Sequence, residues 1–306
     1  MEKINLGKST LKVPSIAIGC MRINSMEKDE LSNYIKFCVE NGLNFFDHAD
    51  IYGRGECEKL FGEALKNSGI KREDIIIQSK CGIVPGKMYD FSKEYILKSV
   101  DGILERLGTD YLDVLVLHRP DALVEPEEVA EAFNILYTSG KVKYFGVSNH
   151  KPSQIELLKK YVKQDILVNQ LQLSLPFSNM IASGLEVNML TDGAYDRDGS
   201  VLDYCRLNDM TIQAWSPFQY GFFEGVFIGS EKYPELNKVL DELAEKYCVT
   251  PTGIATAWIL RHPAKIQMIA GTTKISRLKE IIDGSKIKLT KEEWYRLYIS
   301  AGHILP

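Results

Sequence analysis

The stretch FFDHADIYG, residues 45–53, decides how this sequence is interpreted. It begins as an apolar run that predicts a buried strand, and Asp47 stands where that strand ends. Tyr52 lies in the loop beyond it, while Lys80 and His118 end two later apolar runs. Because parallel β/α proteins carry their chemistry at the carboxyl ends of strands, these four residues predict one site.

Eight short apolar runs are expected to form the strands of the fold. Their near-continuous apolar character is typical of parallel strands that are covered on both faces. An open doubly wound sheet would need fewer strands or a visible second domain. We therefore predict an α/β fold, a TIM-type (β/α)8 barrel, in a single domain that spans 1–306. The expected strands are 15–19, 44–49, 75–80, 113–118, 144–149, 166–170, 211–215 and 267–271.

Helical patterns separate the expected strands. They cover residues 29–41, 56–65, 92–107 and 126–137. Two capping boxes are also expected, one from Ser153 with Glu156 and one from Thr290 with Glu293.

Three segments do not fit the strand–helix repeat. Residues 3–13 predict an N-terminal hairpin that closes the bottom of the barrel. Residues 173–199 predict a long loop, and a loop of that length is usually functional. The C-terminal segment 290–306 predicts a helical tail.

The composition limits the class of protein. The chain has 306 residues, 45% of them hydrophobic and 25% charged, and a formal net charge of -4. Without a basic stripe or a long apolar run, we expect no nucleic-acid partner and no membrane span. The amino terminus lacks the apolar core of a signal peptide, which favours a cytoplasmic protein. The six cysteines form no CxxC pair, so we expect reduced thiols and no metal site.

Asp47, Tyr52, Lys80 and His118 together suit proton transfer to a carbonyl group. An isolated phenol has a pKa of about 10, and a neighbouring ammonium lowers that pKa. Lys80 is expected to lower the pKa of Tyr52, and Asp47 to hold Lys80 charged and oriented. His118 is placed to bind the oxygen that is protonated. Such a set protonates an oxyanion while hydride reaches the carbonyl carbon.

Other strand ends suit a nicotinamide cofactor. Ser148, Asn149 and Gln170 offer donors and acceptors for a flat carboxamide, and Trp215 offers a face for stacking. The segment GTTKISR, 271–277, precedes an expected helix whose amino terminus would favour a phosphate.

With these residues in view, the chain resembles the aldo-keto reductases over nearly its whole length. The motifs FFDHADIYG, IIIQSK, LDVLVLHRP, YFGVSN, VNQ, AWSP and GTTKISRL match that family's signatures in order. HRPD, SKCG and EEWYRL are similar to the bacterial YdhF-like oxidoreductases of the family. The resemblance implies a barrel that reduces an aldehyde or ketone with a nicotinamide cofactor.

The resemblance also implies a role for each matching residue. Tyr52 would be the proton donor, tuned by Lys80 and Asp47, and His118 would orient the substrate carbonyl. NADP(H) is favoured over NAD(H), because Lys274 and Arg277 lie in the segment that binds the adenosine phosphate. The cofactor-binding residues would be Gly19, Met21, Asp47, Ser148, Asn149, Gln170, Trp215, Ser216, Pro217, Phe218, Gly271, Thr272, Thr273, Lys274 and Arg277.

Two other functions remain open at this point. In the first, a metal-dependent hydrolase on the same barrel would use Asp47, His48, Asp50 and His118 as ligands. In the second, a binding protein would keep the cofactor as a redox sensor. The oligomeric state and the small-molecule carbonyl substrate stay open as well.

An apolar rim is expected at the mouth of the barrel, and it would favour apolar aldehydes or ketones over sugar phosphates. Its members would be Tyr220, Phe222, Phe223, Trp294 and Tyr298, unless these aromatics pack the loop and the tail onto the barrel.

Overall fold

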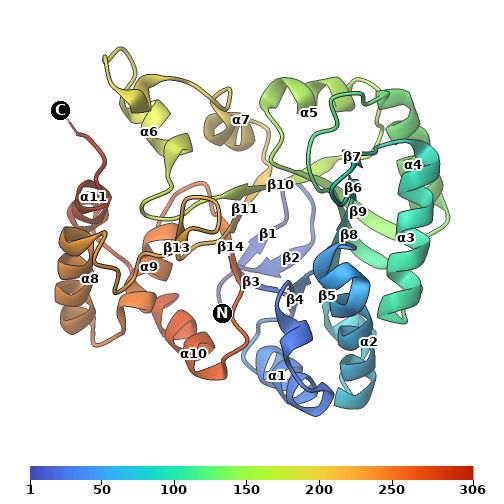
Figure 1. The fold of residues 1–306 in the computed structure, drawn as a ribbon, viewed down its shortest axis with the longest axis horizontal. Helices are drawn as coiled ribbons and strands as arrows, with labels where there is room; N and C mark the ends of the chain where they lie inside the picture. Colours follow the sequence, from blue (N-terminus) through green and yellow to red (C-terminus); the bar gives the residue numbers. More distant parts are fainter. Residues whose placement is uncertain (306) are drawn as a thin grey trace.

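A closed barrel of parallel strands forms the centre of the molecule (Figure 1). The computed structural model describes residues 1–305. All eight expected strands are confirmed, and the fold is a TIM-type (β/α)8 barrel. The barrel strands are β3 (Ile16–Gly19), β4 (Phe45–Asp47), β5 (Ile76–Cys81), β8 (Leu112–Leu117), β9 (Val142–Ser148), β10 (Ile166–Gln172), β11 (Thr211–Trp215) and β14 (Gln267–Ala270).

The helices surround the barrel. The four expected helical segments are confirmed, and the second extends to Ser68, where Gly69 with φ 73° ends it in the left-handed conformation that glycine adopts without strain. The helices are α1 (Lys28–Glu40), α2 (Glu56–Ser68), α3 (Lys93–Leu107), α4 (Pro126–Thr138), α5 (Pro152–Lys159), α6 (Asn179–Leu185), α7 (Val201–Leu207), α8 (Pro234–Tyr247), α9 (Pro251–Leu260), α10 (Ile275–Gly284) and α11 (Lys291–Ser300).

Short elements complete the chain. There are two-stranded hairpins β1 (Lys3–Asn5) with β2 (Lys12–Pro14), β6 (Ile83–Val84) with β7 (Met88–Tyr89), and β12 (Gln219–Tyr220) with β13 (Gly225–Val226). The 3-10 turns are η1 (Ile23–Ser25), η2 (Tyr52–Gly55), η3 (Arg72–Asp74) and η4 (Asp192–Ala194).

One of the two expected capping boxes is confirmed. The Glu293 N–H donates to Thr290 Oγ1 at 3.2 Å, and the Thr290 N–H donates to Glu293 Oε2 at 2.8 Å. The expectation for Ser153 and Glu156 is wrong. Pro152 suits the first helical position, so α5 begins two residues before the start that a Ser153 N-cap implies, and Ser153 lies inside the helix.

The N-terminal hairpin is confirmed at the bottom of the barrel. Ile4, Leu6 and Val13 from this hairpin pack against barrel residues such as Phe45 and Leu167. This apolar layer closes the amino-terminal end of the barrel. The layer above it, toward the carboxyl ends of the strands, contains buried polar side chains instead.

Two expectations for the segments outside the repeat are corrected. Residues 173–199 are not simply a loop, because α6 and η4 form within them. The expectation that Trp294 and Tyr298 belong to the apolar rim is also wrong, because α11 packs on α8 away from the barrel strands (Figure 1). Trp294 is buried there and stacks on Trp258 with ring centroids 5.0 Å apart.

The structure also bears on the expectations for the cysteines and for a membrane span. All six cysteines are free thiols, five of them buried. Among residues 1–305, no helix combines the length and the apolar character that crossing a membrane requires.

Candidate active site

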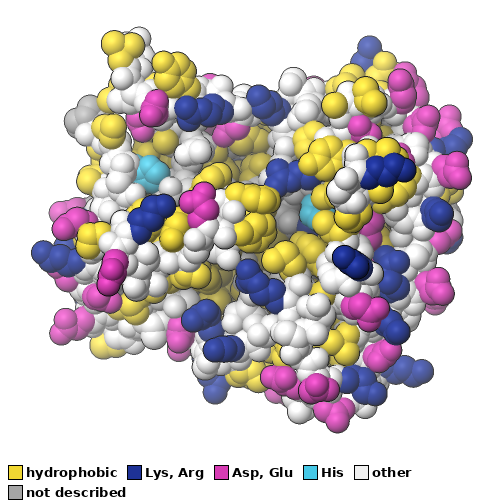
Figure 2. Space-filling model, viewed as in Figure 1, with side chains coloured by type: hydrophobic (Ala, Val, Ile, Leu, Met, Phe, Trp, Pro, Cys, Tyr) yellow, Lys and Arg dark blue, Asp and Glu magenta, His cyan; other side chains and the backbone are white. Residues whose placement is uncertain are grey.

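A cavity of about 650 Å³ opens at the carboxyl ends of the barrel strands. Figure 2 shows this face of the molecule, on which most acidic side chains lie toward the edge, hydrophobic ones gather around the centre, and basic ones occur in both places. Every site residue that the sequence predicts lines the cavity except Lys80, which lies buried beneath it. The structure therefore brings residues from distant parts of the sequence into one place.

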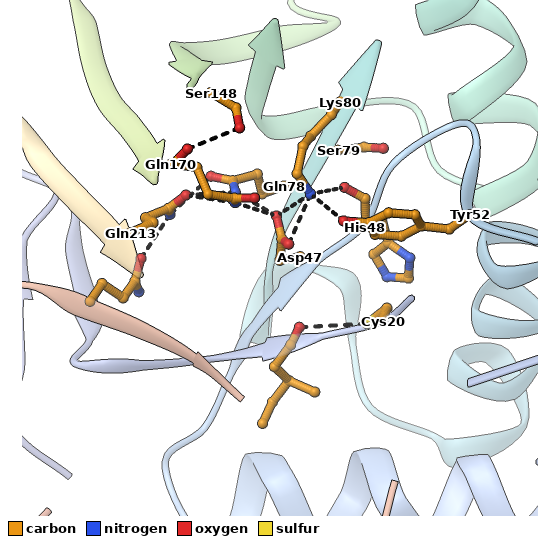
Figure 3. Close-up of polar contacts among 12 residues, drawn as sticks. Cys20, Asp47, His48, Tyr52, Gln78, Ser79, Lys80, Ser148, Gln170 and Gln213 are labelled. Atoms are coloured by element: carbon orange, nitrogen blue, oxygen red, sulfur yellow. Dashed lines mark hydrogen bonds and ion pairs between the residues drawn. The ribbon is translucent and has the colours of Figure 1, made fainter. Parts of the chain in front are cut away.

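A fully buried ammonium forms the floor of the cavity (Figure 3). Lys80 Nζ lies 2.8 Å and 2.9 Å from the two carboxylate oxygens of Asp47. It also donates to the His48 carbonyl oxygen at 2.7 Å and to Tyr52 Oη at 3.2 Å. All the donor capacity of the ammonium is used inside the protein, so its position is fixed before any ligand binds.

Asp47 accepts two further hydrogen bonds from glutamine side chains. Gln78 Nε2 donates to Asp47 Oδ1 at 2.6 Å, and Gln170 Nε2 donates to the same oxygen at 3.1 Å. The carboxylate therefore exchanges its hydration for an ion pair and fixed amide donors. Burial of a charge is tolerated when it is compensated in this way.

The glutamines belong to a network that crosses the interior of the barrel (Figure 3). Gln213 Oε1 accepts from Gln78 Nε2 at 2.8 Å and from Gln170 Nε2 at 3.1 Å. Gln213 Nε2 donates to Gln267 Oε1 at 2.8 Å. Both hydrogens of the Gln170 amide are thus used inside the barrel, which leaves its oxygen for a ligand.

Sequence reasoning missed Gln78, Gln213 and Gln267. The signal is present, because each glutamine stands next to apolar residues in a strand run: IIIQSK, TIQAW and QMIAG. A lone polar residue in such a run indicates a buried partner, but the partner's identity depends on how the strands are arranged around the barrel.

The local electrostatics keep Lys80 charged and Tyr52 protonated. Burial is the largest single influence and acts to lower the pKa of Lys80, but the charges and hydrogen bonds of Asp47 and Tyr52 together outweigh it, so the pKa is raised. Burial likewise raises the pKa of Tyr52, and the Lys80 ammonium offsets only part of this rise. The expectation of a lowered Tyr52 pKa is wrong in its net direction, although Lys80 acts as predicted.

His118 lies beside Tyr52 at the edge of the cavity. The two rings meet edge to face with centroids 6.1 Å apart. Burial is the main cause that holds the pKa of His118 well below its ordinary value, and the Lys80 charge acts in the same direction. His118 is therefore a neutral imidazole, which can donate a hydrogen bond from one ring nitrogen.

The predicted carboxamide residues form a connected group. Ser148 Oγ donates to the Gln170 carbonyl oxygen at 3.0 Å, and Asn149 Nδ2 donates to Ser148 Oγ at 2.7 Å. Trp215 Nε1 donates to Asn149 Oδ1 at 3.2 Å, which fixes the indole ring at the cavity wall. Asn149 has a φ of 58°, a left-handed conformation that asparagine tolerates better than most residues.

The opposite side of the cavity carries the expected phosphate segment. Gly271, Thr272 and Thr273 lead into α10, so the amino terminus of that helix faces the cavity. Lys274 and Arg277 line it and are exposed. Backbone N–H groups, the helix dipole and two cations make this the electropositive end of the cavity.

Lining residues that were not predicted include Ile83, from β6, and Arg119, which follows His118. Arg22 also lines the cavity, at the α10 end, where its Nη1 donates to the Gly271 carbonyl oxygen at 3.4 Å. Phe222 and Phe223, expected in the apolar rim, do line the cavity next to Trp215, whereas Tyr220 packs on Tyr233 with centroids 5.2 Å apart. Phe223 stacks on Trp215 with centroids 6.2 Å apart. Of the five aromatic residues expected in the rim, Phe222 and Phe223 are therefore the two that line the cavity.

The residues of the metal-dependent alternative do not converge. Within residues 1–305, no three His, Cys, Asp or Glu side chains lie together as metal ligands do. Asp47 is engaged by Lys80. His48 points to the ring of Phe61, with centroids 4.5 Å apart.

The chain belongs to the aldo/keto reductase family, whose family model matches residues 15–300. It is an oxidoreductase of that family. The match covers every barrel strand and the whole of the cavity described above, in agreement with the motifs in the sequence.

Several known proteins are similar to this chain. YcsN of Bacillus subtilis (strain 168), named an uncharacterized oxidoreductase, is 36% identical over the whole of both chains. A 6-dehydroglucose reductase of Agrobacterium fabrum (strain C58) is 32% identical over 98% of each. The oxidoreductase YdhF of Escherichia coli (strain K12) is 33% identical over 92% of this chain and 91% of its own, which supports the YdhF-like resemblance.

A solved structure agrees with the barrel. The thermostable aldo-keto reductase Tm1743, crystallised with the inhibitor epalrestat, has a TM-score of 0.77 and 27% identity, covering 98% of this chain and all of that one.

Proposed function

We propose that this protein reduces an aldehyde or ketone to an alcohol with NADPH, with Tyr52 as the general acid. The observation that carries this proposal is the chain of contacts from Asp47 through Lys80 to Tyr52 at the floor of the cavity. A phenol held beside a buried, fully paired ammonium is a proton donor whose conjugate base is stabilised. No other group in the cavity combines a transferable proton with such support.

The residues around the cavity fit a nicotinamide cofactor. The Gln170 oxygen has no hydrogen-bond donor within residues 1–305 and lies where a carboxamide N–H could bind, with Ser148 and Asn149 beside it. Trp215 offers its ring. When bound, the nicotinamide supplies the hydride. The proposed cofactor residues are the predicted ones: Gly19, Met21, Asp47, Ser148, Asn149, Gln170, Trp215, Ser216, Pro217, Phe218, Gly271, Thr272, Thr273, Lys274 and Arg277.

The residues of the chain carry out the proton transfer. Tyr52 Oη gives its proton to the carbonyl oxygen while a C–H bond forms at the carbonyl carbon and the C=O π bond breaks. Lys80 stabilises the phenolate that remains, and solvent returns a proton to it. The neutral His118 donates a hydrogen bond to the same carbonyl oxygen and thereby orients it.

We further propose that NADP(H) is preferred to NAD(H). Lys274 and Arg277 are exposed cations beside the amino terminus of α10, where a ribose phosphate would meet both charges.

Phe222 and Phe223 favour a substrate with an apolar part over a sugar phosphate. One relative is named for 6-dehydroglucose, so uncharged sugar carbonyls belong among the substrates tested.

The test is a panel of aldehydes and ketones with NADPH, followed by the loss of NADPH absorbance. We expect steady turnover with at least one uncharged aldehyde, and little with NADH. If NADPH binds but no carbonyl compound is reduced, the protein is a cofactor-binding sensor and the proposal is wrong.

A further inference from the structure

Arg119 stands apart from the other cations of the cavity. It follows β8, whereas Lys274 and Arg277 follow β14. Arg22 follows β3 and donates from Nη1 to the Gly271 carbonyl oxygen at 3.4 Å, so it belongs to the α10 end as well. Around the closed barrel, β3, β4 and β5 lie between β8 and β14 on one side, and β11, β10 and β9 on the other. β8 and β14 therefore face each other across the mouth, so Arg119 lies on the side away from the proposed phosphate site.

Arg119 lies at the catalytic end of the cavity. It follows His118 directly, and both residues line the cavity with Tyr52. Its guanidinium carbon lies 5.9 Å from the ring centroid of Phe222, the distance of a cation–π contact. A group bound to this guanidinium would therefore belong to the part of a substrate that extends from the carbonyl carbon.

The guanidinium has no acidic partner. Three arginines of this chain are partly buried: Arg72, Arg106 and Arg119. Arg72 pairs with Asp113 at 2.8 Å and Arg106 with Glu58 at 2.7 Å. Arg119 alone has no ion pair or side-chain hydrogen bond to any residue within 1–305. Burial lowers the pKa of Arg119, because the guanidinium loses part of its hydration there.

The cavity itself cannot supply the missing anion. Asp47 is the acidic side chain that lines it, and its oxygens are taken by Lys80, Gln78 and Gln170. A partly desolvated guanidinium gains most from a planar bidentate acceptor, and a carboxylate provides one.

We propose that Arg119 binds a carboxylate of the substrate, so that the preferred substrates are oxo-carboxylates whose acid group lies away from the carbonyl. This inference rests on the proposed reductase function. Phe222 would pack on the carbon framework between the two groups, since its ring already lies over the guanidinium. The apolar wall and the Arg119 guanidinium then recognise different parts of one molecule.

The experiment compares 4-carboxybenzaldehyde with its methyl ester, which has the same ring and carbonyl but no charge. We measure kcat/KM with NADPH for the unmodified protein, Arg119→Met and Arg119→Lys. The ratio of acid to ester should fall about 10- to 100-fold in Arg119→Met, the range expected for a charge-assisted contact. Arg119→Lys should keep part of the ratio, because it keeps the charge but loses the bidentate geometry.

Arg197→Met is the matched control, since it removes an exposed arginine from the 173–199 segment and should leave the ratio unchanged. An unchanged ratio in Arg119→Met overturns the inference while leaving the reductase function intact. A larger Arg119 effect with 4-formylphenyl phosphate than with the acid overturns the carboxylate class. If the unmodified protein reduces no aldehyde at all, the proposed function fails first.

Discussion

The two ends of the cavity are built in opposite ways. At the Lys80 end, the ammonium and the Asp47 carboxylate each have several partners within the protein. At the α10 end, Lys274 and Arg277 are exposed, and their side chains form no ion pair with residues 1–305. Groups that assist a proton transfer must already be held in position when the substrate binds, whereas exposed cations can attract a phosphate without being fixed beforehand.

The largest expected effect tests the Lys80 end. Tyr52→Phe removes the acidic proton but keeps the ring, so kcat should fall about 10²- to 10⁴-fold while the affinity for NADPH stays within about twofold. Tyr137→Phe, on the outside of α4, should change neither. Carbonyl reduction by Tyr52→Phe at the unmodified rate would show that another group is the acid.

Gln213→Leu breaks the network behind Asp47. It deprives the amides of Gln78 and Gln170 of their shared acceptor, and an unsatisfied buried group costs about 1 to 3 kcal/mol of unfolding free energy. If the network orients Gln170, the affinity for NADPH should also fall, whereas a purely structural role would lower stability alone. Denaturant unfolding and cofactor titration measure the two effects separately.

Lys274→Gln and Arg277→Gln test the α10 end. Each should weaken NADPH binding about tenfold, because these exposed contacts are partly screened by solvent, and leave NADH binding nearly unchanged. Raising the salt concentration should reduce the difference between NADPH and NADH. Equal affinity of the unmodified protein for both cofactors would contradict the proposed role of this end.

Asp50 sharpens the comparison, because it lies near the Lys80 end without full pairing. Its buried Oδ1 has no hydrogen-bond partner among residues 1–305. Burial, assisted by Glu58, raises the pKa of Asp50 to about 7. Because the unfolded carboxyl titrates near ~3.9, the folded protein binds the extra proton, so stability falls as pH rises between these values.

Asp50→Asn should remove that pH dependence, with a gain of up to about 4 kcal/mol at pH 8 and almost none near pH 4. Thermal unfolding at both pH values measures it. Identical slopes of stability against pH in the two proteins would show that Asp50 is not the titrating group.

Local patterns in the sequence were sufficient for the strands, most helices and the residues at the strand ends. The apolar runs show where each strand is buried, and the polar residues Asp47, Lys80 and His118 show where it ends. Both signals come from residues that are neighbours along the chain. Pro152 shows the limit of this approach, since the fixed φ of its ring suits the first helical position and α5 begins there, two residues before the start that the Ser153 pattern predicts.

Closure of the barrel decided what the sequence could not. Three arrangements involve residues that are far apart in the chain: Gln78 contacts Gln213, Arg119 lies opposite Lys274, and Trp294 packs on Trp258. The amino-acid sequence by itself determined which residues end each strand and which chemistry they carry. Only the tertiary structure determined which of them face one another, because that depends on the order of the strands around the barrel rather than along the chain.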